Sequence, residues 1–412
     1  MTSTTPHVTV IGSALSGNKG AAAMLESSIA TLEQRLPGVQ FTLLSMYPRE
    51  DREQNTYPNL EIVDARPRTL GVNINSAALA YRLLPPLRGL ITSRSKAVKA
   101  LAESQVLLDQ GGITFTDGRE KFLIYNVASI LPALNVGTPV FKCAQAVGPF
   151  RNRINRLVAR TFLPKAATVV TRGRITQSYA DKLRLTNTFA GADYAFSLEL
   201  DGSEEAAAVA AGIDLSIFDE SVVGLSPSVV LQKKVDAREG DYVGQMVTFI
   251  DQVTASGKKL LLVPHSVRTG TDATHNNDLP LCREIYSKVA DKANVVFIDR
   301  ELPSQVLRYL IGRCSFFVAS RFHAMVSSLA MAVPTLVIGW GHKYEEVLEM
   351  FELQEWAFGH DKLTPTHLWE RYEALLASRD DVAAKLATHL PEVKARSLKQ
   401  ADLIADVVRA GL

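Results

Sequence analysis

The sequence has few cysteines, almost no net charge and no long hydrophobic run. Its three cysteines, Cys143, Cys282 and Cys314, stand far apart. This spacing argues against a disulfide framework or a cysteine-based zinc site, and it is typical of a reducing cytoplasm. No apolar run reaches the roughly 18–20 residues that a membrane-spanning helix needs, and the N-terminus lacks the basic start and apolar core of a secretory signal. We therefore expect a soluble, cytoplasmic protein without a metal ion.

The sequence also has almost no excess of one sign of charge over the other. The 45 Lys and Arg residues against 43 Asp and Glu give a net charge of +2, so the whole chain shows no preference for nucleic acid and any anion site must be local. What the sequence does have is length and apolar content. Its 412 residues, 47% of them hydrophobic, suffice for two or three domains with buried cores.

Short apolar runs rich in β-branched residues alternate with helical patterns, which is typical of parallel α/β layers. Helices such as 21–36 and 242–256 are expected between the strands. The predicted strands are 7–12, 40–45, 60–64, 105–110, 139–145, 167–172 and 187–193 in the first half, and 221–228, 259–266, 294–299, 316–320 and 334–340 in the second.

The domain organisation follows from one segment that breaks this rhythm. Residues 201–220 are acidic, rich in alanine and without a strand pattern, so we interpret them as the connection between two α/β domains, 1–200 and 221–363. Residues 364–412 show helical patterns only, and such a tail is expected to pack across the domain junction.

An arginine, a histidine and a lysine surround one predicted strand–helix pair. Arg321 and His323 lie where a helix should begin after the strand 316–320, and Lys343 follows the next strand. A guanidinium binds carboxylate or phosphate in bidentate fashion, and the dipole at a helix N-terminus has the same sign. Histidine transfers protons near neutral pH. His323 could instead be a buried core histidine and Lys343 a solvated loop residue, but the three together favour an anion site.

A glycine-containing turn after the first strand is a further candidate. Residues 12–24 bring Asn18 and Lys19 to a helix N-terminus, where free backbone N–H groups attract anions. The segment contains neither a dinucleotide-binding glycine pattern nor a phosphate-binding loop with Lys-Ser or Lys-Thr. A strand–helix turn that simply needs glycine explains it equally well.

Further polar residues follow other strands, at the edge where open α/β sheets bind ligands. In LLDQGGITFTDG (107–118), Asp109 or Asp117 could act on a sugar hydroxyl as base or hydrogen-bond acceptor, although Asp117 could equally cap the next helix. Arg172 and His265 lie at two more strand ends. A single such residue is usually structural, whereas several together favour a binding site.

At these positions the sequence resembles the polysaccharide pyruvyl transferase family. The family pattern contains an early glycine turn, a glycine loop after a mid-domain strand, a Gln-x-x-Gly-Pro segment, and a Ser-Arg-x-His block followed by a Val-Pro pair and a lysine. Here these are Gly12–Ala21, Asp109–Asp117, Gln145–Pro149, Ser320–His323, Val333–Pro334 and Lys343. Ala21 stands where an Asp is common and Gln110 where a glycine is common, so acceptor recognition is where this chain departs from the pattern.

The resemblance implies an α/β fold of two Rossmann-like domains facing a cleft, as in GT-B glycosyltransferases. It implies transfer of a pyruvyl group from phosphoenolpyruvate to two hydroxyls of one sugar in a polysaccharide repeat or a glycolipid precursor, forming a cyclic ketal without a cofactor. The N-terminal domain would bind the acceptor and the C-terminal domain the donor. The implied roles are catalytic for His323 and Asp109, phosphoenolpyruvate binding for Arg172, Arg321 and Lys343, and acceptor or cleft contacts for Asn18, Gly112, Asp117 and His265.

Two alternatives remain open on sequence grounds. A nucleotide-sugar glycosyltransferase would share the fold and would need an acidic ribose-binding residue, for which Glu345 and Glu346 are weak candidates. A non-catalytic anion-binding protein of the same fold would retain the cationic residues without using His323.

Residues 80–102 mix arginines and lysines with leucines, which suits contact with a membrane surface and a lipid-linked acceptor at the inner leaflet. A helix hairpin that packs on the sheet with solvated charges is the commoner explanation of such a basic face.

Overall fold

The computed structural model describes residues 5–268, 276–339 and 341–412. Contacts within the chain divide it into two compact units. Unit 1 consists of Met1–Ser16, Met24–Ser197 and Ala395–Leu412, and unit 2 of Gly17–Ala23 and Leu198–Lys394. The division at Ser197 lies close to the predicted end of the first domain, but each unit also takes a short segment from the other end of the chain.

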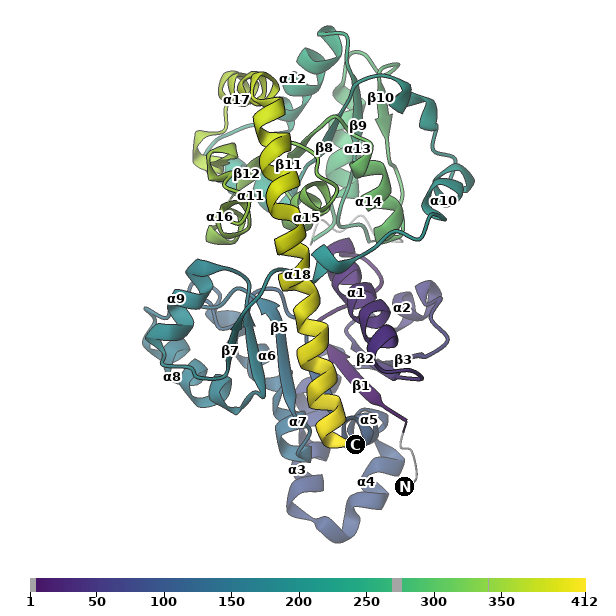
Figure 1. Cartoon of the computed structure of the whole chain (residues 1–412), viewed down its shortest axis with the longest axis vertical. Coiled ribbons are helices and arrows are strands. Elements are labelled where there is room, and N and C mark those ends of the chain that lie inside the picture. The colour runs from purple at the N-terminus through teal and green to yellow at the C-terminus, as the bar shows by residue number, and fades with distance from the viewer. Residues whose placement is uncertain (1–4, 269–275, 340) are drawn as a thin grey trace. The chain divides into compact units, whose positions relative to one another are not determined.

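Unit 1 is built on a seven-stranded parallel sheet with the order β3-β2-β1-β4-β5-β6-β7 (Figure 1). Every residue of the central strands β4 and β5 is buried, as expected when helices cover both faces of a parallel sheet. The strands are β1 (His7–Ile11), β2 (Gln40–Ser45), β3 (Leu60–Asp64), β4 (Val106–Asp109), β5 (Val140–Gln145), β6 (Thr168–Thr171) and β7 (Thr188–Ala190).

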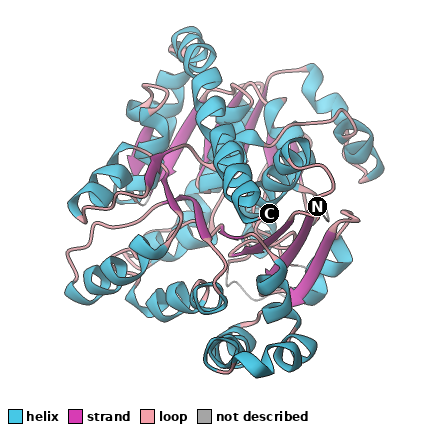
Figure 2. Cartoon of the chain, turned by 60° about the horizontal axis from the view of Figure 1, so that its bottom comes forward, coloured by secondary structure: helices cyan, strands magenta, loops and turns pink. Residues whose placement is uncertain are grey.

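The helices of unit 1 connect these strands in chain order. The region between β3 and β4 holds a π-helical turn, η1 (Thr69–Ile74), and three helices, α3 (Asn75–Leu83), α4 (Arg88–Arg94) and α5 (Lys96–Glu103). The others are α1 (Lys19–Arg35), α2 (Pro48–Gln54), α6 (Leu123–Ala128), α7 (Leu131–Val136), α8 (Arg153–Phe162) and α9 (Arg174–Lys182). Figure 2 shows helices beside the strands throughout the chain.

Unit 2 repeats the plan with a six-stranded parallel sheet of order β10-β9-β8-β11-β12-β13. Its strands are β8 (Val222–Ser226), β9 (Lys259–Leu262), β10 (Val295–Phe297), β11 (Phe316–Ala319), β12 (Thr335–Gly339) and β13 (Ala357–Gly359). Its helices are α10 (Glu204–Ala210), α11 (Val229–Asp236), α12 (Tyr242–Ala255), α13 (Leu279–Lys288), α14 (Ser304–Gly312), α15 (Phe322–Ala330), α16 (His342–Glu349) and α17 (Pro365–Ala377).

The predicted strands are confirmed, and the structure adds one. All twelve predicted segments contain a strand, and β13, a three-residue edge strand, was not predicted. The segment 201–220 contains no strand, as expected, and its helix α10 belongs to unit 2. In the part of the chain that the structure describes, no helix has the combined length and hydrophobicity needed to cross a bilayer.

One long helix, α18 (Arg379–Gly411), ends the chain and contributes to both units (Figure 1). Its part from Ala395 onward belongs to unit 1, where Ile404 and Val408 are fully buried. Gln400 accepts a hydrogen bond from the backbone N–H of Ala144 at 2.9 Å and donates one to the carbonyl of Ala192 at 2.9 Å. The last helix of the chain therefore supplies core and hydrogen bonds to the first sheet.

Candidate functional site

The carboxyl ends of three strands in unit 2 carry His265, predicted as an acceptor or cleft contact, and the predicted catalytic and donor-binding residues His323, Arg321 and Lys343. His265 follows β9, Arg321 and His323 follow β11, and Lys343 lies in the first turn of α16 after β12. Strand β8 lies between β9 and β11, so the direction of the strand order reverses here. Ligands of open α/β sheets bind outside the strand ends at such a reversal.

Arg321 is held by a buried aspartate. Its Nε donates to Asp278 Oδ2 at 2.7 Å, its Nη2 to Asp278 Oδ1 at 2.5 Å, and its Nη1 to Asn276 Oδ1 at 2.9 Å. Although burial alone would lower it, the pKa of Arg321 is raised by the Asp278 carboxylate. These bonds fix the guanidinium and use three of the five N–H groups that it carries.

The Asp278 carboxylate also joins two other loops. It accepts hydrogen bonds from the backbone N–H groups of Val229 and Ser266, both at 3.0 Å. Because Val229 begins α11, Ser266 follows β9 and Arg321 follows β11, one fully buried carboxylate ties three strand-end loops together. The Asp278–Arg321 pair therefore orders the edge of the sheet on which the candidate site lies.

The turn that carries Arg321 and His323 is fixed by two tyrosines. The Tyr242 hydroxyl donates to Ser320 Oγ at 3.1 Å, and the Tyr344 hydroxyl donates to the Ser320 carbonyl at 3.2 Å. Burial raises the pKa of the Tyr242 phenol far above its usual value, so it remains a hydrogen-bond donor at neutral pH. The two tyrosines therefore hold Ser320, just before α15, by its side chain and by its carbonyl group.

The imidazole of His323 rests on the backbone of Gly20. A methyl group on Gly20 would lie 2.0 Å from Nδ1 and 2.1 Å from Cγ of His323, so no larger residue fits here without displacing the ring. Gly20 belongs to the segment Gly17–Ala23, which is part of unit 2. The early glycine turn and the Ser-Arg-x-His block, some 300 residues apart in the sequence, thus meet in one place.

The segment Gly17–Ala23 is joined to the loop after β9 by backbone pairing. Asn18 and Ser266 form an antiparallel bridge, Val267 N donates to the Gly17 carbonyl at 3.0 Å, and Lys19 N donates to the His265 carbonyl at 3.3 Å. The Asn18 side chain accepts a bond from Gly20 N at 3.1 Å and so caps the start of α1. Asn18 and His265 therefore lie in the same cluster as His323.

A lysine and a glutamate complete this contact. Lys19 Nζ lies 2.7 Å from Glu301 Oε1, which also accepts the backbone N–H of Gly17 at 2.8 Å. The Lys19 and Glu301 side chains are only 2% and 8% exposed, so the pair is nearly dry. Glu301 thereby fixes the beginning of α1 in unit 2.

Lys343 is positioned by aromatic rings. Its Nζ lies 4.8 Å from the ring centroid of Phe322 and 5.1 Å from that of Tyr344. The Phe322 ring makes an edge contact with His323, with centroids 5.0 Å apart. Phe322 therefore places Lys343 and His323 in one aromatic cluster.

Several cationic side chains act on His265, although Arg321 and Lys19 among them are paired with Asp278 and Glu301. This histidine is 4% exposed, and its pKa is lowered well below the ordinary value by burial first and then by the charges of His323, Arg321, Arg308 and Lys19. Its imidazole is accordingly neutral at physiological pH. An anion entering this cluster would meet several cationic groups, and neutral imidazole can accept or donate a hydrogen bond there.

In unit 1, the predicted catalytic Asp109 is paired with a buried lysine. Asp109 is the last residue of β4 and lies beside Lys142 of β5, with which it forms an ion pair. Both side chains are almost completely buried. Asp109 Oδ1 also accepts the N–H of Gly111 at 2.9 Å, and the Asp109 carbonyl accepts Gln145 Nε2 at 2.7 Å. This arrangement fixes the loop after β4.

Arg172 also lies in unit 1 and is buried. Its Nη2 is 3.1 Å from Asp193 Oδ2 and donates to the Ala144 carbonyl at 3.2 Å. A methyl group on Gly112 would approach the same nitrogen to 3.3 Å, so Gly112 packs against the guanidinium. Arg172 is thus charge-balanced by Asp193 and supports the loop that contains Gly112.

Asp117 contacts the start of α8. It accepts the backbone N–H groups of Arg151 at 2.5 Å and Asn152 at 3.2 Å, and Asn155 Nδ2 at 2.8 Å. Asp117 thus holds the loop before α8, whose N-cap is Asn152, and these bonds differ from the expected capping of the next helix.

Sequence reasoning missed the partners of the predicted residues. Lys142 gave a signal, because a charged residue interrupts the otherwise apolar strand run PVFKCAQ. Asp278 was visible only as part of a polar loop, and Gly20 as one of several glycines. No motif around Asp193 or Glu301 indicated their roles, because they pair with Arg172 and Lys19, which lie far away in the sequence.

Solved structures resemble the chain over nearly its whole length at low identity. A putative UDP-N-acetylglucosamine 2-epimerase from Listeria monocytogenes matches with a TM-score of 0.61 and 11% identity, covering 95% of this chain and 94% of that one. The UDP-GlcNAc 2-epimerase from Neisseria meningitidis, bound to UDP-GlcNAc, gives 0.61 and 11%, covering 98% and 100%. MnaA from S. aureus, with UDP, gives 0.58 and 10%, covering 93% and 91%. This likeness concerns the fold alone, and the predicted GT-B-like fold is confirmed.

A family model extends the comparison to the sequence. The model of polysaccharide pyruvyl transferase matches residues 18–342, well over half of the chain. The match begins at Asn18, in the segment that pairs with the loop after β9, and it includes the Ser320–His323 turn on which the cationic cluster is built. The chain belongs to the polysaccharide pyruvyl transferase family.

Proposed function

We propose that the chain transfers a pyruvyl group from phosphoenolpyruvate to two hydroxyls of one sugar, forming a cyclic ketal and releasing phosphate. The observation that carries this proposal is the gathering of His265, Arg321, His323 and Lys19 around one strand edge of unit 2, with Lys343 beside His323 on the ring of Phe322. A donor with a carboxylate and a phosphate, the latter worth roughly −1.5 to −2 charges, suits such a cluster.

Donor binding rests on Arg321, Lys343 and the N-terminus of α15. Arg321 is already oriented by Asp278, so an incoming anion meets a preorganised guanidinium. The first turn of α15 adds backbone N–H groups and a partial positive charge. Arg172, the third predicted donor ligand, is paired with Asp193 in unit 1, which favours a positioning role for it.

His323 is the proposed acid. It would deliver a proton to the methylene carbon of phosphoenolpyruvate, which turns that carbon into a methyl group and makes its neighbour electrophilic. One sugar hydroxyl then attacks this neighbour and loses its proton. The C–O bond to phosphate breaks, and the second hydroxyl closes the ring and releases the other proton. The cations would stabilise the charge on the departing phosphate.

We assign acceptor binding to unit 1. There Asp109 and Gly112 lie at the loop after β4, with Lys142 compensating the Asp109 charge. Asp117 supports this role only indirectly, through its bonds to the start of α8. Asn18 and His265 lie in unit 2, in the same cluster as His323, so we propose that they contact the donor rather than the acceptor. The three buried free cysteines favour a reducing cytoplasm as the place of this reaction.

The donor is tested by calorimetric titration with phosphoenolpyruvate, inorganic phosphate and UDP-N-acetylglucosamine in separate experiments. Phosphoenolpyruvate should bind most tightly, and Lys343→Ala should weaken it by about 1.5–3 kcal/mol because a charge-assisted contact is lost. Lys362→Ala, an exposed lysine of the same unit, is the matched control. Preference for UDP-N-acetylglucosamine would instead support the glycosyltransferase alternative, for which Glu346 is unsuited because it is fully buried.

The reaction itself is tested by turnover in D₂O with a panel of oligosaccharides. Protonation of the methylene carbon should place one deuterium in the methyl group of the ketal, which mass spectrometry detects. Release of phosphate without ketal formation, or binding of phosphoenolpyruvate without turnover for any acceptor, would favour the non-catalytic anion-binding alternative.

A further inference from the structure

Large apolar side chains are exposed mainly in one part of unit 1. Of the large hydrophobic residues exposed in the described chain, all except Val209 and Leu412 fall between residues 72 and 157. They are Val72, Leu79, Leu83, Leu84, Leu87, Leu90, Phe122, Ile124, Ile154 and Leu157. A concentration of this kind marks an interaction surface more often than chance exposure does.

Two of these residues, Ile124 and Ile154, line an apolar groove. A hollow of about 640 Å³ is lined by Gly71 and Asn75 beside α3, Ile124 of α6, and Ile154 and Phe162 of α8. Asn75, Leu79 and Leu83 follow one another at four-residue spacing on α3, so an exposed stripe continues from the groove along that helix. We call the exposed surface of α3, α4, α6 and α8 the basic–apolar face.

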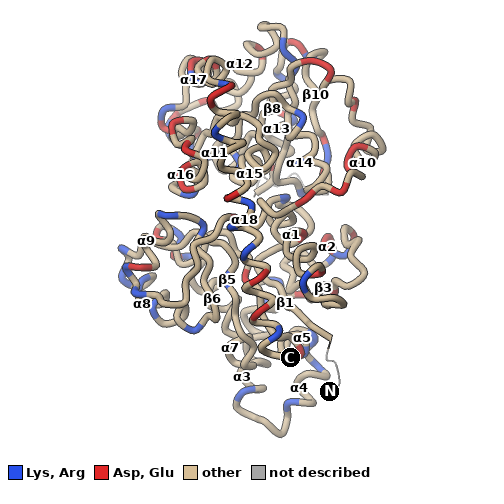
Figure 3. The backbone as a smooth tube through the Cα atoms, viewed as in Figure 1, with Lys and Arg blue, Asp and Glu red and all other residues tan. Residues whose placement is uncertain are grey.

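Positive charge predominates on this face, although Arg66, Lys96 and Lys99 beside it are paired with Asp64, Glu61 and Glu103. Residues 65–102 contain seven Arg and Lys residues, and residues 149–165 contain five, with no Asp or Glu in either segment. Figure 3 shows the positive residues along α4 and α8. Glu120 at the rim of the groove is the acidic exception. A chain with a net charge of only +2 therefore concentrates positive charge where it also exposes leucine and isoleucine.

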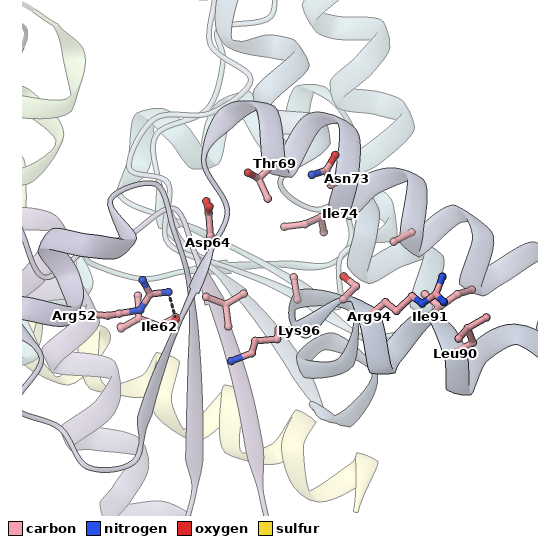
Figure 4. Close-up of a pocket in the computed structure, with 14 residues that line it drawn as sticks. Arg52, Ile62, Asp64, Thr69, Asn73, Ile74, Leu90, Ile91, Arg94 and Lys96 are labelled. Atoms are coloured by element: carbon pink, nitrogen blue, oxygen red, sulfur yellow. Dashed lines mark hydrogen bonds between the residues drawn. The ribbon is translucent and has the colours of Figure 1, made fainter.

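Helix α4 is not required to cover the core, whereas α3 buries Ala78. Helix α4 has no buried residue, and a hollow of about 610 Å³ separates it from β3. Figure 4 shows Leu90, Ile91 and Arg94 of α4 on one side of this hollow and Ile62 and Asp64 of β3 on the other. Packing on the sheet thus does not explain the leucines of α4 and of the turn before it.

We propose that the basic–apolar face is a contact surface for an anionic lipid bilayer. Leucine and isoleucine side chains would enter the headgroup boundary, and the arginines and lysines would lie among anionic headgroups. A second copy of the chain is disfavoured as the partner, because a symmetric contact would bring the same positive charges together. The inference does not rest on the proposed reaction, since its test measures binding to vesicles.

The test is co-sedimentation of the full chain with phosphatidylcholine vesicles that contain or lack phosphatidylglycerol. Binding should require phosphatidylglycerol and weaken with salt. Arg88→Gln and Arg94→Gln should each weaken it about fivefold. Leu83→Ser with Leu87→Ser should weaken it further. A second set on α8, Arg156→Gln with Leu157→Ser, tests the other half of the face independently.

Val209→Ser and Arg238→Gln are matched controls, because both residues are exposed in unit 2. They should leave vesicle binding unchanged, and thermal unfolding should show that all variants fold. The proposal is overturned if the chain does not sediment with anionic vesicles at low salt, or if neither set of variants weakens binding. It is also overturned if analytical ultracentrifugation shows a dimer that the same variants dissociate.

Discussion

At the scale of single residues, the contact between Gly20 and His323 is the most demanding in the candidate site. Gly20→Ala adds a methyl group 2.0 Å from Nδ1 of His323, so the ring must move. A displacement of about 1 Å can cost roughly 10²-fold in turnover, and we expect a loss of that size in the folded protein. Because the methyl group would also lie 2.4 Å from His323 Cβ, overpacking should lower stability by about 1–3 kcal/mol. Turnover and thermal unfolding of the one variant check this.

Gly89→Ala is the matched control for this substitution. Gly89, like Gly20, is the second residue of a helix, and a methyl group there would have no neighbour within 4 Å. Its turnover should equal that of the unchanged chain. Normal turnover in Gly20→Ala as well would show that the position of the His323 ring does not matter for the reaction.

The role of His323 is separable from its packing. His323→Gln keeps a side chain of similar reach but cannot transfer a proton, so turnover should fall about 10²–10⁴-fold while affinity for phosphoenolpyruvate changes little. Steady-state kinetics and calorimetry on the same preparation measure both quantities. A histidine with a purely structural role would instead lower the melting temperature and leave the folded fraction active.

At the scale of elements, Asp278 holds together the loops after β8, β9 and β11. Asp278→Asn removes the fully buried charge that balances the partly buried Arg321, and breaking a buried pair costs up to about 3–5 kcal/mol. Urea unfolding should report a loss of this size. Asp299→Asn is the control, because Asp299 is 53% exposed in its pair with Arg300 and should change stability by less than about 0.5 kcal/mol. Equal effects of the two substitutions would contradict the proposed role of Asp278.

Most elements of secondary structure could be predicted from the sequence, but not all of their contacts. The strands were predictable because buried parallel strands form uninterrupted apolar runs, and Ser320–His323 was predictable because polar residues directly follow such a run. The three-residue β13 was too short to give a pattern. The assignment of Gly17–Ala23 to unit 2 was not predictable either, since it depends on Glu301 and Ser266, which lie more than 240 residues away.

At the scale of the whole molecule, buried histidine makes stability depend on pH. The pKa of His265 is lowered well below 6.5 by burial and neighbouring positive charge, so the unfolded chain binds a proton near pH 6.5 that the folded chain does not bind. Stability contributed by neutral His265 is therefore present above pH 6.5 and is lost as pH falls below it, by up to about 1.4 kcal/mol per pH unit.

The free energy of unfolding, measured in urea at several pH values between about 7.5 and 5, tests this dependence, because histidine titrates in that range. His265→Gln should remove part of the slope below pH 6.5. His7 and His360 also have pKa values lowered chiefly by burial and should supply a remaining slope of the same sign. If stability falls equally steeply with pH in the unsubstituted protein and in His265→Gln, His265 is not buried as a neutral group.

The placement of the chain's two ends has a consequence for its synthesis. A ribosome releases a protein from its N-terminus onward, and domains usually fold in that order. Here the sheet of unit 1 is made before most of unit 2, but Ile404, Val408 and Gln400, which pack against or bond to that sheet, are made after it. The segment Gly17–Ala23 cannot pack in unit 2 until residues 198–394 have been made. Neither unit corresponds to one continuous stretch of messenger RNA, so the nascent chain must keep an unfinished first unit from aggregating until residues 395–411 have been made.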